Sequence, residues 1–143
     1  MKLRTGTNLS SLLFVGLLAL CGPTSASEAD ENAAVAASRQ WLSIADEGQY
    51  GQCWDNSASF FKKNVKKKDL EAKLKATRGQ FGDLVSRKLK VKQFKTAMPG
   101  APDGKYVVIQ YETSFAHKQK AVETVTPMLD KDGEWKVSGY YIN

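Results

Sequence analysis

The sequence predicts an α+β domain in which three N-terminal helices pack on one face of a curved antiparallel sheet of about four strands. Two observations predict this fold. Apolar residues recur at helical spacing from Asp30 to about Gly82, and beyond Gly82 the period of the apolar residues changes from 3.6 to 2. Turn residues then separate four strand-like runs, and short connections of this kind join antiparallel neighbours.

The first 26 residues have the three parts of a secretory signal. Lys2 and Arg4 give a positive start, residues 12–21 are continuously apolar, and small residues follow a helix-breaking Gly-Pro pair. A helix needs about twenty apolar residues to span a bilayer, so this run is too short to act as a membrane anchor. We therefore expect a signal peptide over residues 1–26 and an exported protein, either periplasmic or secreted.

The expected cleavage site lies between Ala26 and Ser27, which leaves a single α+β domain over residues 27–143. Lipidation at Cys21 is the less favoured alternative. A lipoprotein signal has a small residue directly before the cysteine, and this chain has the bulky Leu20 there.

Three helices follow from the apolar stripes. The first spans residues 30–46, and the second spans residues 49–63. The third begins with Asp69 as its N-cap and ends near Gly79 or Gly82.

Four strands follow from alternation and turn signals. In residues 85–92 the odd positions are mostly apolar, so Leu89 and Val91 should face the helices while Lys88, Lys90 and Lys92 face water. The remaining strands are residues 106–115, 121–129 and 134–143. On the last of them, Trp135 and Val137 should face the helices.

Two charged residues interrupt otherwise apolar strand faces. Arg87 shares a face with Leu89, and Glu123 shares a face with Val125. A buried charge must be compensated. The two residues therefore either line a pocket or pair, with each other or with Lys118, in a structural network. We favour the structural network.

The chain carries a formal net charge of +6, which falls to +4 once the signal and its two basic residues are removed. A positive balance raises nucleic acid as a partner, but export argues against it. Anionic lipid, cell-surface polysaccharide and acidic proteins remain. The densest cluster is interpreted as a solvated helix end and comprises Lys62, Lys63, Lys66, Lys67 and Lys68.

Several chemistries are disfavoured by composition. His117 is the only histidine, which excludes a multi-histidine metal site. Cys53 is the only cysteine outside the signal, so no internal disulfide forms in the mature chain. It lies beside Trp54 in an apolar helix and should be buried. The chain has no glycine-rich phosphate loop and no nucleophile elbow. We expect no cofactor and no metal.

A series of phrases in fixed order resembles a known bacterial family. They are Trp41-Leu42, Asp46-x-Gly48-x-Tyr50, Trp54, Ser86-Arg87, the run from Pro99 to Tyr106, Thr113-Ser114-Phe115, Glu123-Thr124-Val125, and Gly133-x-Trp135-x-Val137-x-Gly139-Tyr140. Together they resemble the family called domain of unknown function 4019, over roughly residues 33–143. The resemblance implies a cone-shaped fold similar to nuclear transport factor 2 and cystatin, and it brings no known activity. Where that family has an aromatic residue at the start of the third helix, this chain has Asp69-Leu70.

These observations favour an exported, non-catalytic ligand-binding or protein-interaction module of the bacterial envelope. Its partner is unknown, with an envelope protein or an anionic surface as candidates, and the oligomeric state is not predicted. A pocket between helices and sheet would be lined by Trp41, Trp54, Arg87, Tyr111, Glu123 and Tyr140. The alternative is a small periplasmic hydrolase or isomerase that uses Glu112 or Glu123 beside a tyrosine. Fold analogy alone supports that alternative, and fold does not imply function.

Overall fold

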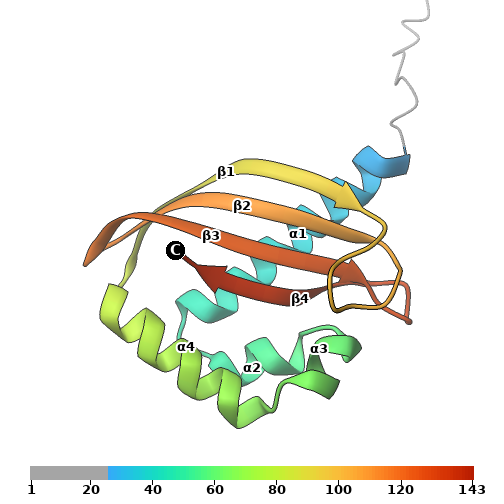
Figure 1. Cartoon of the computed structure of the whole chain (residues 1–143). Coiled ribbons are helices and arrows are strands. Elements are labelled where there is room, and N and C mark those ends of the chain that lie inside the picture. The colour runs from blue at the N-terminus through green and yellow to red at the C-terminus, as the bar shows by residue number, and fades with distance from the viewer. Residues whose placement is uncertain (1–25) are drawn as a thin grey trace, which may run out of the picture.

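The computed structural model describes residues 26–143 as helices followed by one antiparallel sheet (Figure 1). Residues 1–25 of the expected signal peptide, Cys21 among them, lie outside the described residues. The elements in order are α1 (Ala26–Asp46), α2 (Tyr50–Asp55), α3 (Ser59–Asn64), α4 (Lys67–Phe81), β1 (Leu84–Lys95), β2 (Tyr106–Phe115), β3 (Lys118–Leu129) and β4 (Trp135–Ile142).

The sheet is a meander in the order β1-β2-β3-β4, with every neighbouring pair antiparallel. The long helix α1 crosses one face of the sheet and contacts all four strands. Helix α2 packs against α4, and both lie below the sheet in the view of Figure 1. The predicted α+β class is confirmed, with four helices in place of three. In the described part of the chain, no helix has both the length and the hydrophobicity of a membrane span.

The second predicted helix is two short helices, because residues 57 and 58 leave the helix to contact the sheet. Ala58 has an extended conformation, with φ −58° and ψ 149°. Its N–H donates to the carbonyl of Val137 at 2.8 Å, and Ser57 forms a parallel bridge with that same residue. A contact with a residue so distant in sequence gives no local signal, so the apolar stripe alone predicted one continuous helix.

The third predicted helix begins earlier than expected. Lys66 is the N-cap of α4, and Asp69 lies in the first turn rather than at the cap. A carboxylate there still stabilises the helix, because it faces the positive end of the helix dipole. The helix ends at Gly82, whose φ of 75° suits glycine.

The prediction for Val91 and Lys92 is wrong because β1 contains an irregularity. Leu89 pairs with Tyr111 but Val91 pairs with Gln110, so one extra residue reverses the alternation. Val91 is 40% exposed. Lys92 turns toward α1 instead of water, where its Nζ donates to Asn32 Oδ1 at 2.8 Å.

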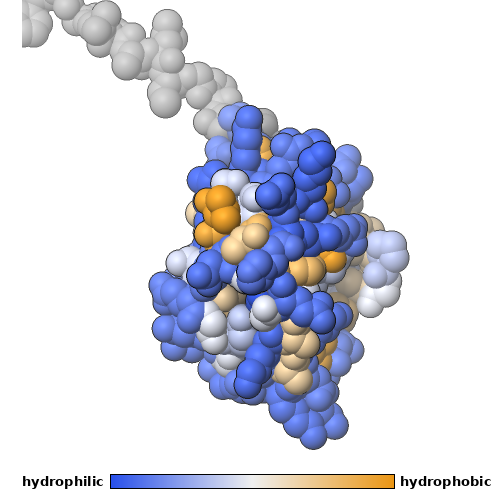
Figure 2. All heavy atoms as spheres, turned by 90° about the vertical axis from the view of Figure 1, so that its left-hand side faces the viewer, coloured by the Kyte–Doolittle hydropathy of each residue, from blue (hydrophilic) through white to orange (hydrophobic). Residues whose placement is uncertain are grey.

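The core lies between the sheet and α1, α2 and α4. Its buried members are Ala34, Val35, Trp41, Leu42, Ala45, Cys53, Leu70, Leu74, Val107, Ile109, Tyr111, Val125 and Val137. Trp135 faces α1 as predicted but is only half-buried, at the margin of this cluster. At the end of the molecule shown in Figure 2, hydrophilic side chains cover most of the surface and hydrophobic ones appear in small patches between them.

The turn between β3 and β4 holds α3 in place. Asp130 in this turn accepts hydrogen bonds from the backbone N–H of Ser59 at 2.8 Å and from its hydroxyl at 2.5 Å. The carboxylate thereby satisfies an N–H at the start of α3 that no residue of its own helix reaches.

The irregularity in β1 predicts different outcomes for two neighbouring residues. Val91→Thr should change the free energy of unfolding by less than about 0.5 kcal/mol, because the side chain is on the surface. Leu89→Thr should cost about 1–3 kcal/mol, because Leu89 packs against the core. Urea titrations of both variants measure the difference. Equal losses would show that β1 alternates without interruption.

Candidate functional site

The centre of the candidate site is Glu123 on β3, whose side chain is fully buried. Its Oε2 accepts hydrogen bonds from Arg87 Nε and from the hydroxyl of Thr113, both at 2.6 Å. Its Oε1 accepts from the hydroxyl of Tyr140 at 2.6 Å and from Arg87 Nη2 at 3.1 Å. Four donors from three other strands therefore satisfy this carboxylate.

Arg87 also links the sheet to the last residue of α1. Its Nη1 donates to Asp46 Oδ2 at 2.7 Å and its Nη2 donates to Oδ1 at 2.9 Å. Arg78 of α4 donates to Asp46 Oδ1 at 2.5 Å, and its Nη1 lies 3.9 Å from Glu123 Oε1. The guanidinium of Arg78 also stacks 4.8 Å from the centre of the Phe115 ring.

This buried charge network contains two carboxylates and two guanidinium groups, so its formal charges cancel. Burial opposes ionisation of Asp46, but hydrogen bonds from Arg87 and Arg78 outweigh it and lower the pKa of Asp46 below its usual value. For Arg87, burial alone would lower the pKa, and the bonds to Asp46 and Glu123 instead raise it. Asp46 and the two arginines therefore stabilise each other in the charged state.

Tyr140 and Trp41 close the network on the core side. Burial and the adjacent charge of Glu123 raise the pKa of Tyr140, so the phenol stays protonated and donates. The Tyr140 ring lies 5.0 Å from the ring of Trp41. The indole N–H of Trp41 donates to the carbonyl of Cys53 at 2.9 Å, and it lies 3.1 Å from the hydroxyl oxygen of Ser57. Both aromatic side chains are thus engaged within the core.

Tyr111 lies next to the network and is also engaged. Its hydroxyl shares a 2.6 Å hydrogen bond with Ser38 of α1, whose hydroxyl oxygen is also 2.8 Å from the carbonyl of Val35. Tyr111 is 1% exposed. The phenol joins the sheet to α1 and leaves no free group facing a ligand.

Trp54 lies apart from the other five candidates. Its indole N–H donates to the carbonyl of Val65 at 2.7 Å, beneath the lysine-rich start of α4. The ammonium groups of Lys62 and Lys67 lie 5.5 and 6.0 Å from its ring centre. The structure therefore brings together Trp41, Arg87, Tyr111, Glu123 and Tyr140 but separates Trp54 from them.

Sequence reasoning did not single out Asp46 and Arg78. Arg78 had a signal, because it continues the buried positions Leu70 and Leu74 at a spacing of four along α4. Asp46 had no signal beyond its place in a family phrase, because it lies at the end of a helix and off the apolar stripe, as many solvated residues do.

The network reaches the surface beside Asp46 and Arg87. A hollow of about 250 Å³ beside Asp46 and Arg87 is bordered by Arg39 and Ser43. Asp46 and Arg87 retain 20% and 12% of their side-chain exposure, while Glu123 retains none. Solvent thus reaches the outer pair of charges and not the inner carboxylate.

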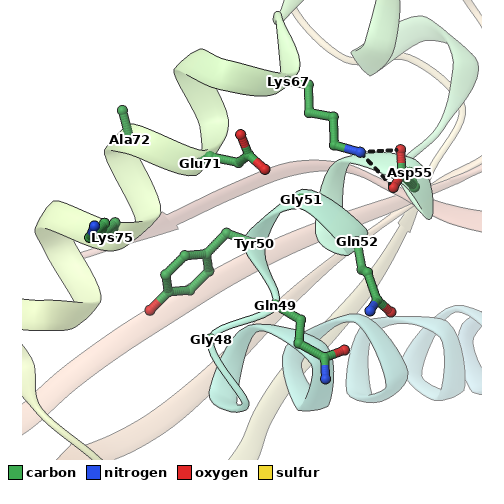
Figure 3. A pocket seen from close by; sticks show the side chains of 10 residues that line it. All are labelled: Gly48, Gln49, Tyr50, Gly51, Gln52, Asp55, Lys67, Glu71, Ala72 and Lys75. Carbon is green, nitrogen blue, oxygen red and sulfur yellow. Dashed lines mark hydrogen bonds and ion pairs between the residues drawn. The ribbon is translucent and has the colours of Figure 1, made fainter.

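A second depression, of about 450 Å³, lies where the start of α2 meets α4 (Figure 3). Its polar groups are mostly surface side chains, and Lys67 and Asp55 pair there at 2.8 Å. A methyl group on Gly51 would lie 2.5 Å from Glu71 Oε1, so a side chain there would displace the end of the flexible Glu71 side chain.

Two further side chains could carry chemistry, Cys53 and His117. Burial raises the pKa of the Cys53 thiol to about 12, so the sulfur is a thiol and not a thiolate nucleophile. His117 is exposed in the turn between β2 and β3. Within residues 26–143, no group of three or more histidine, cysteine or acidic residues could hold a metal ion.

Comparison with known families gives one match. Residues 37–140 match the model of "Protein of unknown function (DUF4019)". The chain belongs to this family. The matched segment contains all the residues of the buried charge network. No curated protein and no solved structure matches the chain.

The network of this DUF4019 chain can be dissected with a double-mutant cycle. Glu123→Leu and Arg87→Met should each destabilise by about 3–5 kcal/mol, because each leaves unbalanced buried charge. The double variant should recover much of that loss, since Asp46 and Arg78 still neutralise each other.

Thermal melts of the three variants measure the coupling. The exposed pair Lys90–Glu112, at 2.5 Å, is the matched control, and Glu112→Leu should leave the melting temperature almost unchanged. Small, additive effects in the Arg87–Glu123 cycle would contradict a structural role for the pair.

Asp46 also predicts a dependence of stability on pH. Its pKa is lower in the folded chain than the usual value of 3.8, so the unfolded chain binds the proton more tightly. The stability it contributes is complete above about pH 4 and is lost as the pH falls further. Asp46→Asn should be less stable at neutral pH and should lose less between about pH 4 and 2. Parallel acid titrations of both proteins, monitored by circular dichroism, would refute this if the two curves keep a constant separation.

Proposed function

We propose that this chain is an exported, non-catalytic ligand-binding or protein-interaction module of the bacterial envelope. One observation carries the non-catalytic part. Glu123, the carboxylate at the centre of the candidate pocket, is fully buried and accepts four hydrogen bonds. A general acid or base must reach substrate and exchange a proton near neutral pH. A carboxylate held by two nitrogens of Arg87 and two hydroxyls supports an architectural role instead.

The other carboxylate suggested for a hydrolase or isomerase gives that alternative no more support. Glu112 is exposed and pairs with Lys90 at 2.5 Å, with both side chains 54% in contact with solvent. It lies on the face of the sheet away from the helices and not in a shielded pocket. Recognition through the surface therefore agrees better with the arrangement than catalysis in the interior.

Export is supported by the sequence of residues 1–26, with its basic start, apolar run and small residues before Ser27. A module without a disulfide suits this destination only if its lone cysteine is shielded. Cys53 is fully buried. The packed core then supplies the stability that other exported domains of this size take from cross-links.

The full chain, expressed in a bacterial host, tests this proposal when a photo-crosslinking amino acid replaces one surface residue at a time. Lys73 on α4, Arg39 on α1 and Lys88 on β1 sample three faces. The chain should appear in the periplasmic fraction or medium with the mass of residues 27–143. At least one position should give a discrete crosslinked product, because an interaction module presents a contact face.

Retention in the cytoplasm with an uncleaved N-terminus would contradict export. Absence of any crosslink from all three faces, together with hydrolysis of model esters that is abolished by Glu123→Gln, would contradict the non-catalytic role. A Lys88→Gln variant serves as the control for such a hydrolysis assay, because Lys88 lies on the solvent face of β1.

A further inference from the structure

A groove runs between α4 and β4, the last strand of the sheet. It has a volume of about 320 Å³ and is lined mainly by apolar side chains. They are Phe61, Val65, Leu70, Leu74, Tyr140, Tyr141 and Ile142, with Asp69, Lys73 and Thr77 as the polar members. Tyr141 is 52% exposed and, with Val85 and Val91, is one of the large hydrophobic residues on the surface of the described chain.

One wall of this groove is an open sheet edge. Val122 and Asn143 exchange two backbone hydrogen bonds, at 3.0 and 3.1 Å. Backbone groups alternate in direction along an antiparallel strand, so those of Ile142 and Tyr140 point away from β3. Within residues 26–143, no backbone segment outside the sheet hydrogen-bonds to either residue. These donors and acceptors form a template for another strand.

The chain itself already uses the neighbouring part of the same edge. Ala58 donates to the carbonyl of Val137, and Ser57 pairs with Val137 in parallel. Strand pairing on this side of β4 is therefore compatible with the packing of the helices. Beyond Val137 that pairing ends and the groove begins.

The other wall carries unneutralised positive charge. Residues 62–75 contain seven lysines and only two acidic residues. Lys73 lines the groove, and Lys66, the N-cap of α4, precedes it by seven positions and lies about 10 Å away on the same side of the helix. No carboxylate of the described residues forms an ion pair with either. Asp69 between them offsets only part of this charge.

We propose that this groove binds an extended acidic segment of another protein, which adds a fifth strand beside β4. Apolar side chains at alternate positions of the segment would enter the groove, and carboxylates at its ends would meet Lys66 and Lys73. Backbone hydrogen bonds to Tyr140 and Ile142 supply affinity, and the alternate side chains supply specificity. This inference rests on the proposed role as an interaction module and assigns that role a surface and a partner chemistry.

Charge favours an acidic segment over a second copy of the chain as the occupant of the groove. Two copies paired through β4 would bring both lysine-rich α4 helices to one interface, where like charges repel. An anionic lipid surface would satisfy the lysines but has no backbone groups for the edge of β4. An acidic peptide strand satisfies both.

The probe is a synthetic nonapeptide, Glu-Asp-Val-Thr-Val-Thr-Val-Glu-Asp with blocked ends, added to residues 27–143. We expect its binding to shift the amide signals of Tyr140 and Ile142 and to slow their hydrogen exchange. Lysine in place of its four acidic residues should weaken binding by at least about tenfold, as should N-methylation of alternate core residues. Lys73→Glu should weaken it similarly, whereas the matched change Lys88→Glu should alter it less than about twofold.

No binding at millimolar peptide would overturn the proposal, as would equal binding of the lysine peptide or shifts confined to other elements. Self-association that shifts the same amide signals without peptide would show that the occupant is a second copy of the chain. Binding to phosphatidylglycerol vesicles without peptide binding would show that the occupant is a lipid surface. If a partner crosslinks from Arg39 or Lys88 and not from Lys73, the interaction module stands and this groove is the wrong surface. If nothing crosslinks, the proposed function itself fails.

Discussion

The burial of Glu123 is the constraint on which the rest of the structure depends. A carboxylate removed from water must find compensating charge and hydrogen bonds, and here every partner comes from a different element. Arg87 comes from β1, Thr113 from β2, and Tyr140 from β4. Asp46 then draws Arg78 of α4 and the end of α1 toward the same point. A different placement of any of these elements would leave a buried charge without its partner.

This arrangement adds specificity rather than large stability. Buried ion pairs are often no more favourable than apolar residues of similar volume, because desolvation offsets the attraction. Directional bonds nevertheless distinguish one packing from its near neighbours in a way that apolar contacts do not. Arg78 illustrates the cost, since its Nε and Nη1 are buried and have no hydrogen-bond partner in the described structure. We infer that the four charges mainly determine how the helices sit on the sheet.

Features that follow from the periodicity of the sequence were predicted. Features that depend on contacts between residues distant in sequence were not. β2 has the predicted bounds because its β-branched and aromatic run lies between clear turns. Arg87 and Glu123 stood out because each interrupts an apolar face. The break before α3 depends on Val137, about 80 residues further on, and the irregularity after Leu89 depends on pairing with β2. Neither feature produces a local pattern in the sequence. Trp54 was predicted to lie with the other aromatic residues because no sequence pattern indicates its hydrogen bond to Val65.

The lone thiol of the described chain has a consequence for how the protein behaves in an oxidising compartment. Cys53 lies where α2 meets α1, and its Sγ is 3.9 Å from the carbonyl oxygen of Trp41. A thiol that is both enclosed and protonated reacts slowly with disulfides, since exchange requires an accessible thiolate. The folded chain is therefore protected from mispaired dimers, and the sulfur becomes reactive only when α1 separates from α2. The rate at which a thiol reagent modifies Cys53 therefore measures how often α1 and α2 separate.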